Sequence, residues 1–136
     1  MYLVDTSVWV HALRRAGNAA VGDLLKPIIV AGDAAITEWI VLELMTGLRG
    51  KERKESLLEL LSPLRYLSLD SGGWQTSWEN AVSLRRHGIT PTAADCLIAT
   101  VALVHGVELI HCDSDFEAMK RVLSLETVDW TAVAGS

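Results

Sequence analysis

The sequence predicts a three-layer α/β/α sandwich around a mainly parallel sheet, and three observations support this fold class. Short apolar runs alternate along the chain with longer segments of helical periodicity, which is the pattern of βαβ units. The length of 136 residues suits one domain, so we expect a single domain over residues 1–136. Half of the residues are hydrophobic and 21% are charged, as in an ordered domain with a buried core.

The expected elements follow from apolar periodicity and from the residues that start or stop helices. The expected strands cover residues 2–4, 34–36, 65–69, 107–111 and 125–128, and the expected helices cover 6–15, 19–31, 37–48, 51–61, 74–87, 91–105 and 116–122. Pro27 predicts a kink or break in the second helix. Thr90 is expected to be the N-cap of the sixth helix, with Pro91 in its first turn. Glycines or Ser62-Pro63 follow most of the other helices and predict where they end.

The overall charge is acidic, because 12 Lys and Arg face 17 Asp and Glu, a formal charge of −5. A broad basic face for duplex DNA is therefore not expected, although bound divalent cations can change the local sign and keep nucleic acid open as a partner. No apolar run approaches the length of a membrane span and no signal peptide is evident, so we expect no membrane contact. Two cysteines without a CxxC pattern favour a reducing cytoplasm.

Acidic residues follow two of the predicted strands. Asp5 ends the first strand, and Asp113 and Asp115 come directly after the strand at 107–111. Ligands of open parallel sheets bind outside the carboxyl ends of the strands. These three carboxylates are therefore expected at one edge of the sheet.

Two further acids lie within apolar helical segments. Asp95 shares a helical face with Ile98 and Ala102, and Glu43 shares one with Trp39 and Ile40. An ionised carboxylate on a buried face needs a partner.

A divalent cation is the partner that best fits these acids. Two carboxylates ~4 Å apart repel by about 4 kcal/mol at an effective dielectric of 20. The chain offers no comparable set of well-placed cations, since its four lysines are Lys26, Lys51, Lys54 and Lys120. Carboxylate and water oxygens suit Mg²⁺ or Mn²⁺.

The acids occur in four short motifs that together resemble a known family. The motifs are Val4-Asp5-Thr6-Ser7, Glu43-Leu44 followed by Gly47, Asp95-Cys96-Leu97-Ile98-Ala99, and Asp113-Ser114-Asp115-Phe116. Each is weak alone, but their order and their positions at the ends of the expected elements resemble a PIN domain, specifically a VapC-type toxin of a type II toxin–antitoxin system.

The resemblance implies a PIN-like five-stranded parallel sheet and a set of site residues. Asp5, Glu43, Asp95 and Asp113 match the family's catalytic, metal-binding acids, Asp115 is a fifth and more peripheral acid, and Ser7 matches a residue that helps to hold the site. The implied activity is Mg²⁺- or Mn²⁺-dependent cleavage of RNA. The implied partners are a second copy in a homodimer and an inhibitory cognate antitoxin (VapB-like). Cys112 departs from the common Thr and predicts weaker support of Asp113, because a thiol is a weak donor.

The mechanism expected from these residues is metal-assisted hydrolysis, with Asp5, Asp95 and Asp113 as ligands. Glu43 either ligates through water or accepts a proton. Two alternatives remain at this point: a catalytically inactive PIN-like interaction module, and an Asp-based phosphotransfer or phosphatase domain. Structural explanations of single acids also remain, namely capping by Asp5, a helix-dipole role for Asp95, an ion pair of Glu43 with Arg49, and turn positions for Asp113 and Asp115.

The aromatic and basic residues allow more than one interpretation. Trp74 and Trp78 are one helical turn apart and favour core or dimer packing over stacking on bases. The four histidines lack ligand spacing and are expected to be structural. The basic clusters at 14–15, 49–54 and 85–86 suit either RNA phosphates or an acidic antitoxin segment. Cys96 and Cys112 are expected to be small packing residues near the site.

Overall fold

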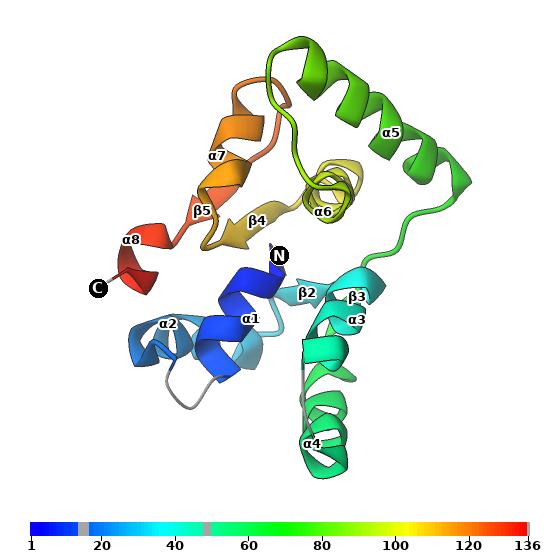
Figure 1. Ribbon diagram of the computed structural model, residues 1–136. Helices are drawn as coiled ribbons and strands as arrows, with labels where there is room; N and C mark the ends of the chain where they lie inside the picture. Colours follow the sequence, from blue (N-terminus) through cyan, green and yellow to red (C-terminus); the bar gives the residue numbers. More distant parts are fainter. Residues whose placement is uncertain (14–16, 48–49, 136) are drawn as a thin grey trace.

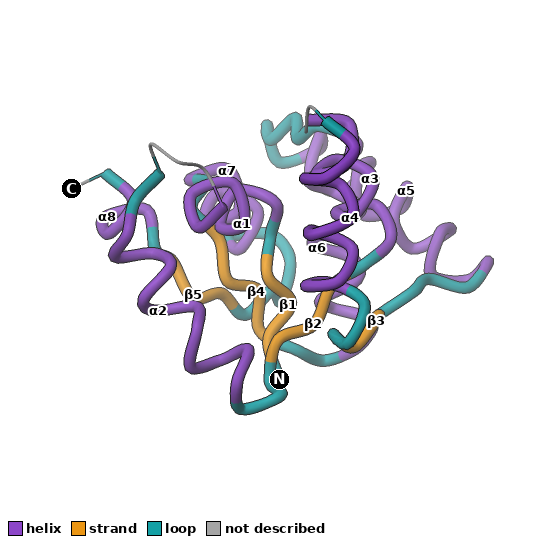
Figure 2. Tube along the Cα trace, turned by 90° about the horizontal axis from the view of Figure 1, so that it is seen from below, coloured by secondary structure: helices purple, strands orange, loops and turns teal. Residues whose placement is uncertain are grey.

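A five-stranded parallel sheet forms the centre of the fold in a computed structural model that describes residues 1–13, 17–47 and 50–135, without the side chains of Lys51 and Glu52. Its strands are β1 (Tyr2–Val4), β2 (Ala34–Ile36), β3 (Arg65–Tyr66), β4 (Glu108–His111) and β5 (Thr127–Asp129). The strand order is β3-β2-β1-β4-β5, and every neighbouring pair is parallel (Figure 2). The predicted parallel five-stranded sheet is confirmed.

Helices cover both faces of this sheet. In the described ranges they are α1 (Thr6–Leu13), α2 (Ala19–Val30), α3 (Glu38–Gly47), α4 (Lys51–Leu61), α5 (Ser71–Arg86), α6 (Ala93–His105), α7 (Ser114–Lys120) and α8 (Thr131–Ala134). Figure 1 shows α1 and α2 on one side of the sheet and α6 and α7 on the other. This division is the one that the right-handed rule for parallel crossovers predicts, because the chain moves outward from β1 in one direction and from β4 in the other. The three-layer α/β/α prediction is confirmed.

The core lies between the central strands and the helices beside them. Leu3 and Val4 of β1 and Ile110 of β4 are fully buried. Trp9 of α1 is buried next to them, and its indole N–H donates a hydrogen bond to the carbonyl of Val4 at 3.2 Å. This bond satisfies the one polar atom of a large side chain that otherwise contributes only apolar surface.

The sheet has its topological switch point between β1 and β4. Val4 pairs with Ile110, and the backbone N–H of Asp5 donates to the carbonyl of Ile110 at 2.9 Å. Connections from β1 and from β4 leave in opposite directions at their carboxyl ends, the arrangement at which open α/β sheets form their ligand-binding crevices. Asp5 and the residues after His111 therefore lie at the position where open α/β sheets bind ligands.

The start of α6 differs from the prediction. Thr92, not Thr90, is the N-cap: its backbone is extended, and its hydroxyl accepts a hydrogen bond from the N–H of Asp95 at 3.1 Å. Both threonines suit a cap, and the position of the first helical turn decides between them. Pro91 consequently precedes the helix. At the other end, Gly106 adopts a left-handed conformation (φ 65°) as the expected C-cap.

Several other boundaries also differ from the predictions. The predicted break at Pro27 is wrong, because α2 continues through Pro27 to Val30. Helix α5 begins earlier than expected, since Asp70 caps it by accepting from the N–H of Gly73 at 2.8 Å. Strand β3 is shorter than expected, α7 and β5 are displaced by about two residues, and α8 was not predicted. The expected helix ends at residues 14–15 and 48 lie outside the described residues.

Of the helices described, none combines the length with the apolar character needed to cross a bilayer.

Candidate metal centre

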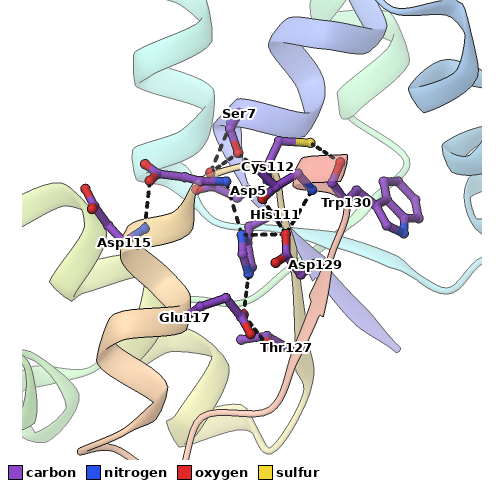
Figure 3. Close-up of polar contacts among 11 residues, drawn as sticks. Asp5, Ser7, His111, Cys112, Asp115, Glu117, Thr127, Asp129 and Trp130 are labelled. Carbon is purple, nitrogen blue, oxygen red and sulfur yellow. Dashed lines mark hydrogen bonds and ion pairs between the residues drawn. The ribbon is translucent and has the colours of Figure 1, made fainter. Parts of the chain in front are cut away.

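Asp5 occupies the carboxyl end of β1 and is only 4% exposed. Its Oδ2 accepts hydrogen bonds from the backbone N–H of Ser7 at 3.0 Å and from the Ser7 hydroxyl at 2.5 Å (Figure 3). Burial raises the pKa of Asp5, and the negative charge of Glu43 adds to this effect against the hydrogen bonds from Ser7. Folding thus holds a desolvated carboxylate at the switch point of the sheet.

Asp113 and Asp115 follow β4 at the start of α7. Asp113 is the N-cap of α7, and its Oδ1 accepts from the backbone N–H of Asp115 at 3.0 Å. Its own backbone N–H donates to Nδ1 of His111 at 3.1 Å. Both acids therefore occupy the turn that begins α7, as the structural explanation from sequence proposed. The same hydrogen bonds fix the orientation of Asp113.

Asp95 lies in the first turn of α6. Burial, together with the negative charges of Asp5 and Asp113, raises the pKa of Asp95 to about 6, against the lowering effect of the Thr92 hydroxyl. The favourable dipole of a helix N-terminus would lower this pKa. Burial and repulsion by the neighbouring carboxylates therefore act on Asp95 in the opposite direction to the dipole.

Glu43 lies on α3, half-buried, with its Oε1 accepting from the hydroxyl of Thr6 at 2.8 Å. Its charge acts on Asp5, which places it on the same side of the site. The alternative ion pair with Arg49 falls outside the described residues.

The predicted acids do not all meet at one point. Carboxylate oxygens of Asp95, Asp113 and Asp115 lie within 4.8 Å of one another. Asp5 and Glu43 are not part of this group of three, and they border it through the charge of Asp5 on Asp95 and of Glu43 on Asp5. Asp115, which was expected to be a peripheral acid, is one of the three whose carboxylate oxygens lie within 4.8 Å of one another.

The donor atoms of this group suit a hard divalent cation. All are carboxylate oxygens, the ligand type of Mg²⁺ and Mn²⁺, and they come from α6 and the start of α7. The raised pKa of Asp95 gives a second indication, because three clustered carboxylates need a positive charge before all can ionise. The residues therefore fit the implied ion.

Cys112 does not support Asp113 through its thiol. The thiol points to the carbonyl of Trp130 at 3.8 Å, whereas its backbone N–H donates to the Ser7 hydroxyl at 3.0 Å (Figure 3). The backbone N–H of Asp113 is held instead by Nδ1 of His111, and the weaker support expected at Asp113 stays a prediction. Burial raises the pKa of Cys112 to about 11, so the thiol stays protonated at neutral pH.

The tryptophans on α5 do not pack in the core. Trp74 is 47% and Trp78 is 60% exposed. With Trp39 they line a cavity of about 250 Å³ that also touches Ala94 and Leu97 of α6. Packing of Trp74 and Trp78 in the core, one of the roles expected from the sequence, is thereby excluded. Of the basic residues, Arg85 and Arg86 are exposed in the last turn of α5, and Arg53 and Lys54 of the 49–54 cluster are exposed on α4. Residues 14–15 and 49 lie outside the described residues.

A second polar cluster was missed by the sequence reasoning. His111, Glu117 and Asp129 place ligand-type atoms within 4.8 Å of one another. The contact between His111 and Asp129 depends on the register of β4 against β5, in which these two residues are paired. The spacing of His111 and Glu117 across the start of α7 was the available signal.

The fold and the site define the class of this protein: an open parallel α/β domain with carboxylates clustered at the switch point of its sheet. Comparison with known proteins identifies the family. The PIN domain family matches residues 2–122. The VapC ribonuclease Mb1587 of Mycobacterium bovis is 29% identical over 133 residues, which cover 96% of this chain and 99% of that protein. This chain belongs to the PIN-domain family, as the four motifs predicted.

Solved structures show the same fold. The structure of FitAB bound to an IR36 DNA fragment has a TM-score of 0.78 at 28% identity, covering 95% of this chain and 94% of that one. VapBC-5 of Mycobacterium tuberculosis, described as a member of the VapBC family of toxin–antitoxin systems, has a TM-score of 0.64 at 21% identity, covering 93% and 96%. The second likeness concerns the fold alone.

Proposed function

We propose that this protein is a divalent-metal-dependent ribonuclease that acts as the toxin of a toxin–antitoxin pair. The observation that carries the chemistry is the convergence of Asp95, Asp113 and Asp115 within 4.8 Å beside the buried Asp5. The likeness to proteins named VapC ribonuclease supports RNA as the substrate. A cognate antitoxin and a homodimeric assembly are proposed on the same family basis.

Asp95, Asp113 and Asp115 would hold the ion, with Asp5 contributing from the end of β1. A bound Mg²⁺ or Mn²⁺ supplies a positive charge that activates water and stabilises charge on the attacked phosphate. With a pKa of about 6 in the metal-free protein, Asp95 would release its remaining proton on binding an ion. Ser7 keeps Asp5 in place by donating two hydrogen bonds to one oxygen, Oδ2.

Glu43 is assigned to the same site through its contact with Thr6 and its charge on Asp5. Glu43→Gln separates the two roles left open above. The amide retains an oxygen that can ligate but cannot accept a proton. Loss of turnover at unchanged Mn²⁺ affinity assigns the proton role. Retained turnover at unchanged Mn²⁺ affinity assigns ligation through water, because the amide oxygen keeps that contact.

The Asp-based phosphatase alternative lacks its supporting lysine. All four lysines lie in helices: Lys26 in α2, Lys51 and Lys54 in α4, and Lys120 in α7. No described strand end carries one. An inactive PIN-like module has no specific support, since each of the matched acids is present.

Cleavage of RNA by the purified full chain tests the proposal. We expect cleavage with Mg²⁺ or Mn²⁺, none with excess chelator, and none for Asp95→Ala. Asp23→Ala, an exposed acid on α2, is the matched control and should cleave like the wild type. Full activity of Asp95→Ala, or cleavage unaffected by chelator, would contradict the proposal.

A further inference from the structure

His111 connects the metal centre to a hydrogen-bond network that reaches β5. Its side chain is fully buried at the end of β4. Nδ1 faces the backbone N–H of Asp113 at 3.1 Å. Nε2 faces Oε2 of Glu117 at 2.7 Å, as Figure 3 shows. A backbone N–H can only donate, so Nδ1 is the acceptor and the proton lies on Nε2. Both ring nitrogens are therefore occupied by hydrogen bonds within the protein.

Glu117 is held in turn by a third element. Its Oε2 also accepts from the hydroxyl of Thr127 on β5 at 2.6 Å. Next to it, the ring of Phe116 packs against the imidazole with centroids 5.2 Å apart. Contacts from α7 and β5 thus fix the orientation of one imidazole ring.

The same residues do not form a second cation site. His111, Glu117 and Asp129 have the proximity that a metal requires. However, the lone pair on Nδ1 is used by the N–H of Asp113, and Nε2 carries a proton toward Glu117. Asp129 lies 4.0 Å from Nδ1, and its Oδ1 accepts from the backbone N–H of Thr131 at 2.8 Å. The cluster is a hydrogen-bond network between elements.

We infer that His111 is a positioning residue that sets the orientation of Asp113 for the metal centre, an inference that rests on the proposed function. The Nδ1 acceptor fixes the peptide that begins the loop from β4 to α7. Asp113 then caps α7 through the N–H of Asp115, so one contact orients two of the three clustered acids. Partners of this kind behind metal ligands are worth about 10- to 100-fold in metal affinity.

Two substitutions of His111 distinguish the role of Nδ1 from that of Nε2. Asparagine places an amide oxygen near the position of Nδ1, and glutamine places an amide nitrogen near that of Nε2. Mn²⁺ affinity of the purified full chain, measured from the electron paramagnetic resonance signal of free Mn²⁺, is the readout. We expect His111→Gln to bind Mn²⁺ about tenfold more weakly or worse, and His111→Asn to stay close to the wild type.

Glu117 provides a second pair that leaves the buried ring in place. Glu117 is 36% exposed, so substitution is tolerated. Glu117→Gln retains an oxygen for Nε2–H and for the Thr127 hydroxyl, and should bind Mn²⁺ like the wild type. Glu117→Ala removes that oxygen and should weaken binding. Circular dichroism confirms that each variant is folded.

The outcomes separate this inference from the proposed function. Equal Mn²⁺ affinity in wild type and His111→Gln, or equal losses in the Gln and Asn variants, would overturn the positioning role while leaving the metal centre intact. The same holds if Glu117→Ala binds like Glu117→Gln. A wild-type chain that takes up no Mn²⁺ would overturn the metal centre itself, and the inference with it.

Discussion

The hydroxyl of Ser7 accepts a hydrogen bond from the backbone N–H of Cys112 at 3.0 Å, although 105 positions separate the two residues. The same hydroxyl donates to Oδ2 of Asp5. One side chain therefore joins the carboxyl ends of β1 and β4, the two strands that flank the switch point. This contact joins the backbone bond from Asp5 N–H to the carbonyl of Ile110 in holding Asp5 beside the loop that carries Asp113.

Replacing Ser7 should destabilise the fold and loosen the site. Ser7→Ala leaves the N–H of Cys112 without its acceptor and removes one donor to the buried Asp5, a loss of about 1–3 kcal/mol in the free energy of unfolding. Urea denaturation measures it. Ser62→Ala, at an exposed position after α4, is the control and should change stability little. Equal effects of the two substitutions would refute the bridging role.

The cap of α6 offers a direct choice between two threonines. Thr92→Ala removes the hydroxyl that accepts from the N–H of Asp95 and should cost about 1 kcal/mol. Thr90→Ala, at an exposed position before the helix, should cost almost nothing. Thermal denaturation of both variants measures the two losses in stability. A larger loss for Thr90→Ala would restore the cap that the sequence pattern favours.

Asp95 should make stability fall as pH rises. In the folded metal-free chain the pKa of Asp95 is about 6, against an ordinary value of 3.8. Between these pH values the folded state binds more protons than the unfolded state, so the free energy of unfolding decreases as pH rises through this window. Asp95→Asn cannot ionise. It should therefore match the wild type near pH 4 and exceed it in stability at pH 7.5 without metal.

Asp23→Asn is the control for this comparison, and its stability should follow that of the wild type at every pH. Taking the difference between variant and wild type removes the opposite contributions of acids such as Glu117 and Asp129, whose pKa values are lowered. If Asp95→Asn is less stable than the wild type at pH 7.5, the helix dipole governs Asp95 and the repulsive cluster does not.

Divalent ions should stabilise the folded chain. An ion that binds only the folded state at 100 times its Kd adds about 2.7 kcal/mol, which raises Tm by several degrees. MnCl₂ should produce this shift in the wild type, and Asp113→Ala should reduce it sharply. KCl at equal ionic strength controls for charge screening. An identical rise with KCl would mean that no specific site binds Mn²⁺.

The fold was largely predictable because its signals are local. Buried strands such as Tyr2–Val4 and Ala34–Ile36 are short apolar runs, and the alternation with helices determines the parallel connection. Boundaries set by a single hydrogen bond were not predictable. Asp70 and Thr92 each cap a helix from one of several equivalent polar residues, and only the three-dimensional arrangement selects them.

The acids of the candidate site were also accessible from sequence, since they interrupt apolar segments or follow strands. Their grouping was not. That Asp115 lies with Asp95, and that Asp5 and Glu43 border the group, depends on how α6 and α7 approach each other. The network of His111 and Glu117 was missed because it joins β4, α7 and β5, whose register no sequence period reveals.

Anomalous X-ray diffraction from crystals grown with Mn²⁺ tests the central claim most directly, because the described residues include two clusters of ligand-type atoms. We predict a manganese peak in contact with the carboxylates of Asp95, Asp113 and Asp115. A peak among His111, Glu117 and Asp129, or no peak at either cluster with Mn²⁺ in excess, would contradict the account.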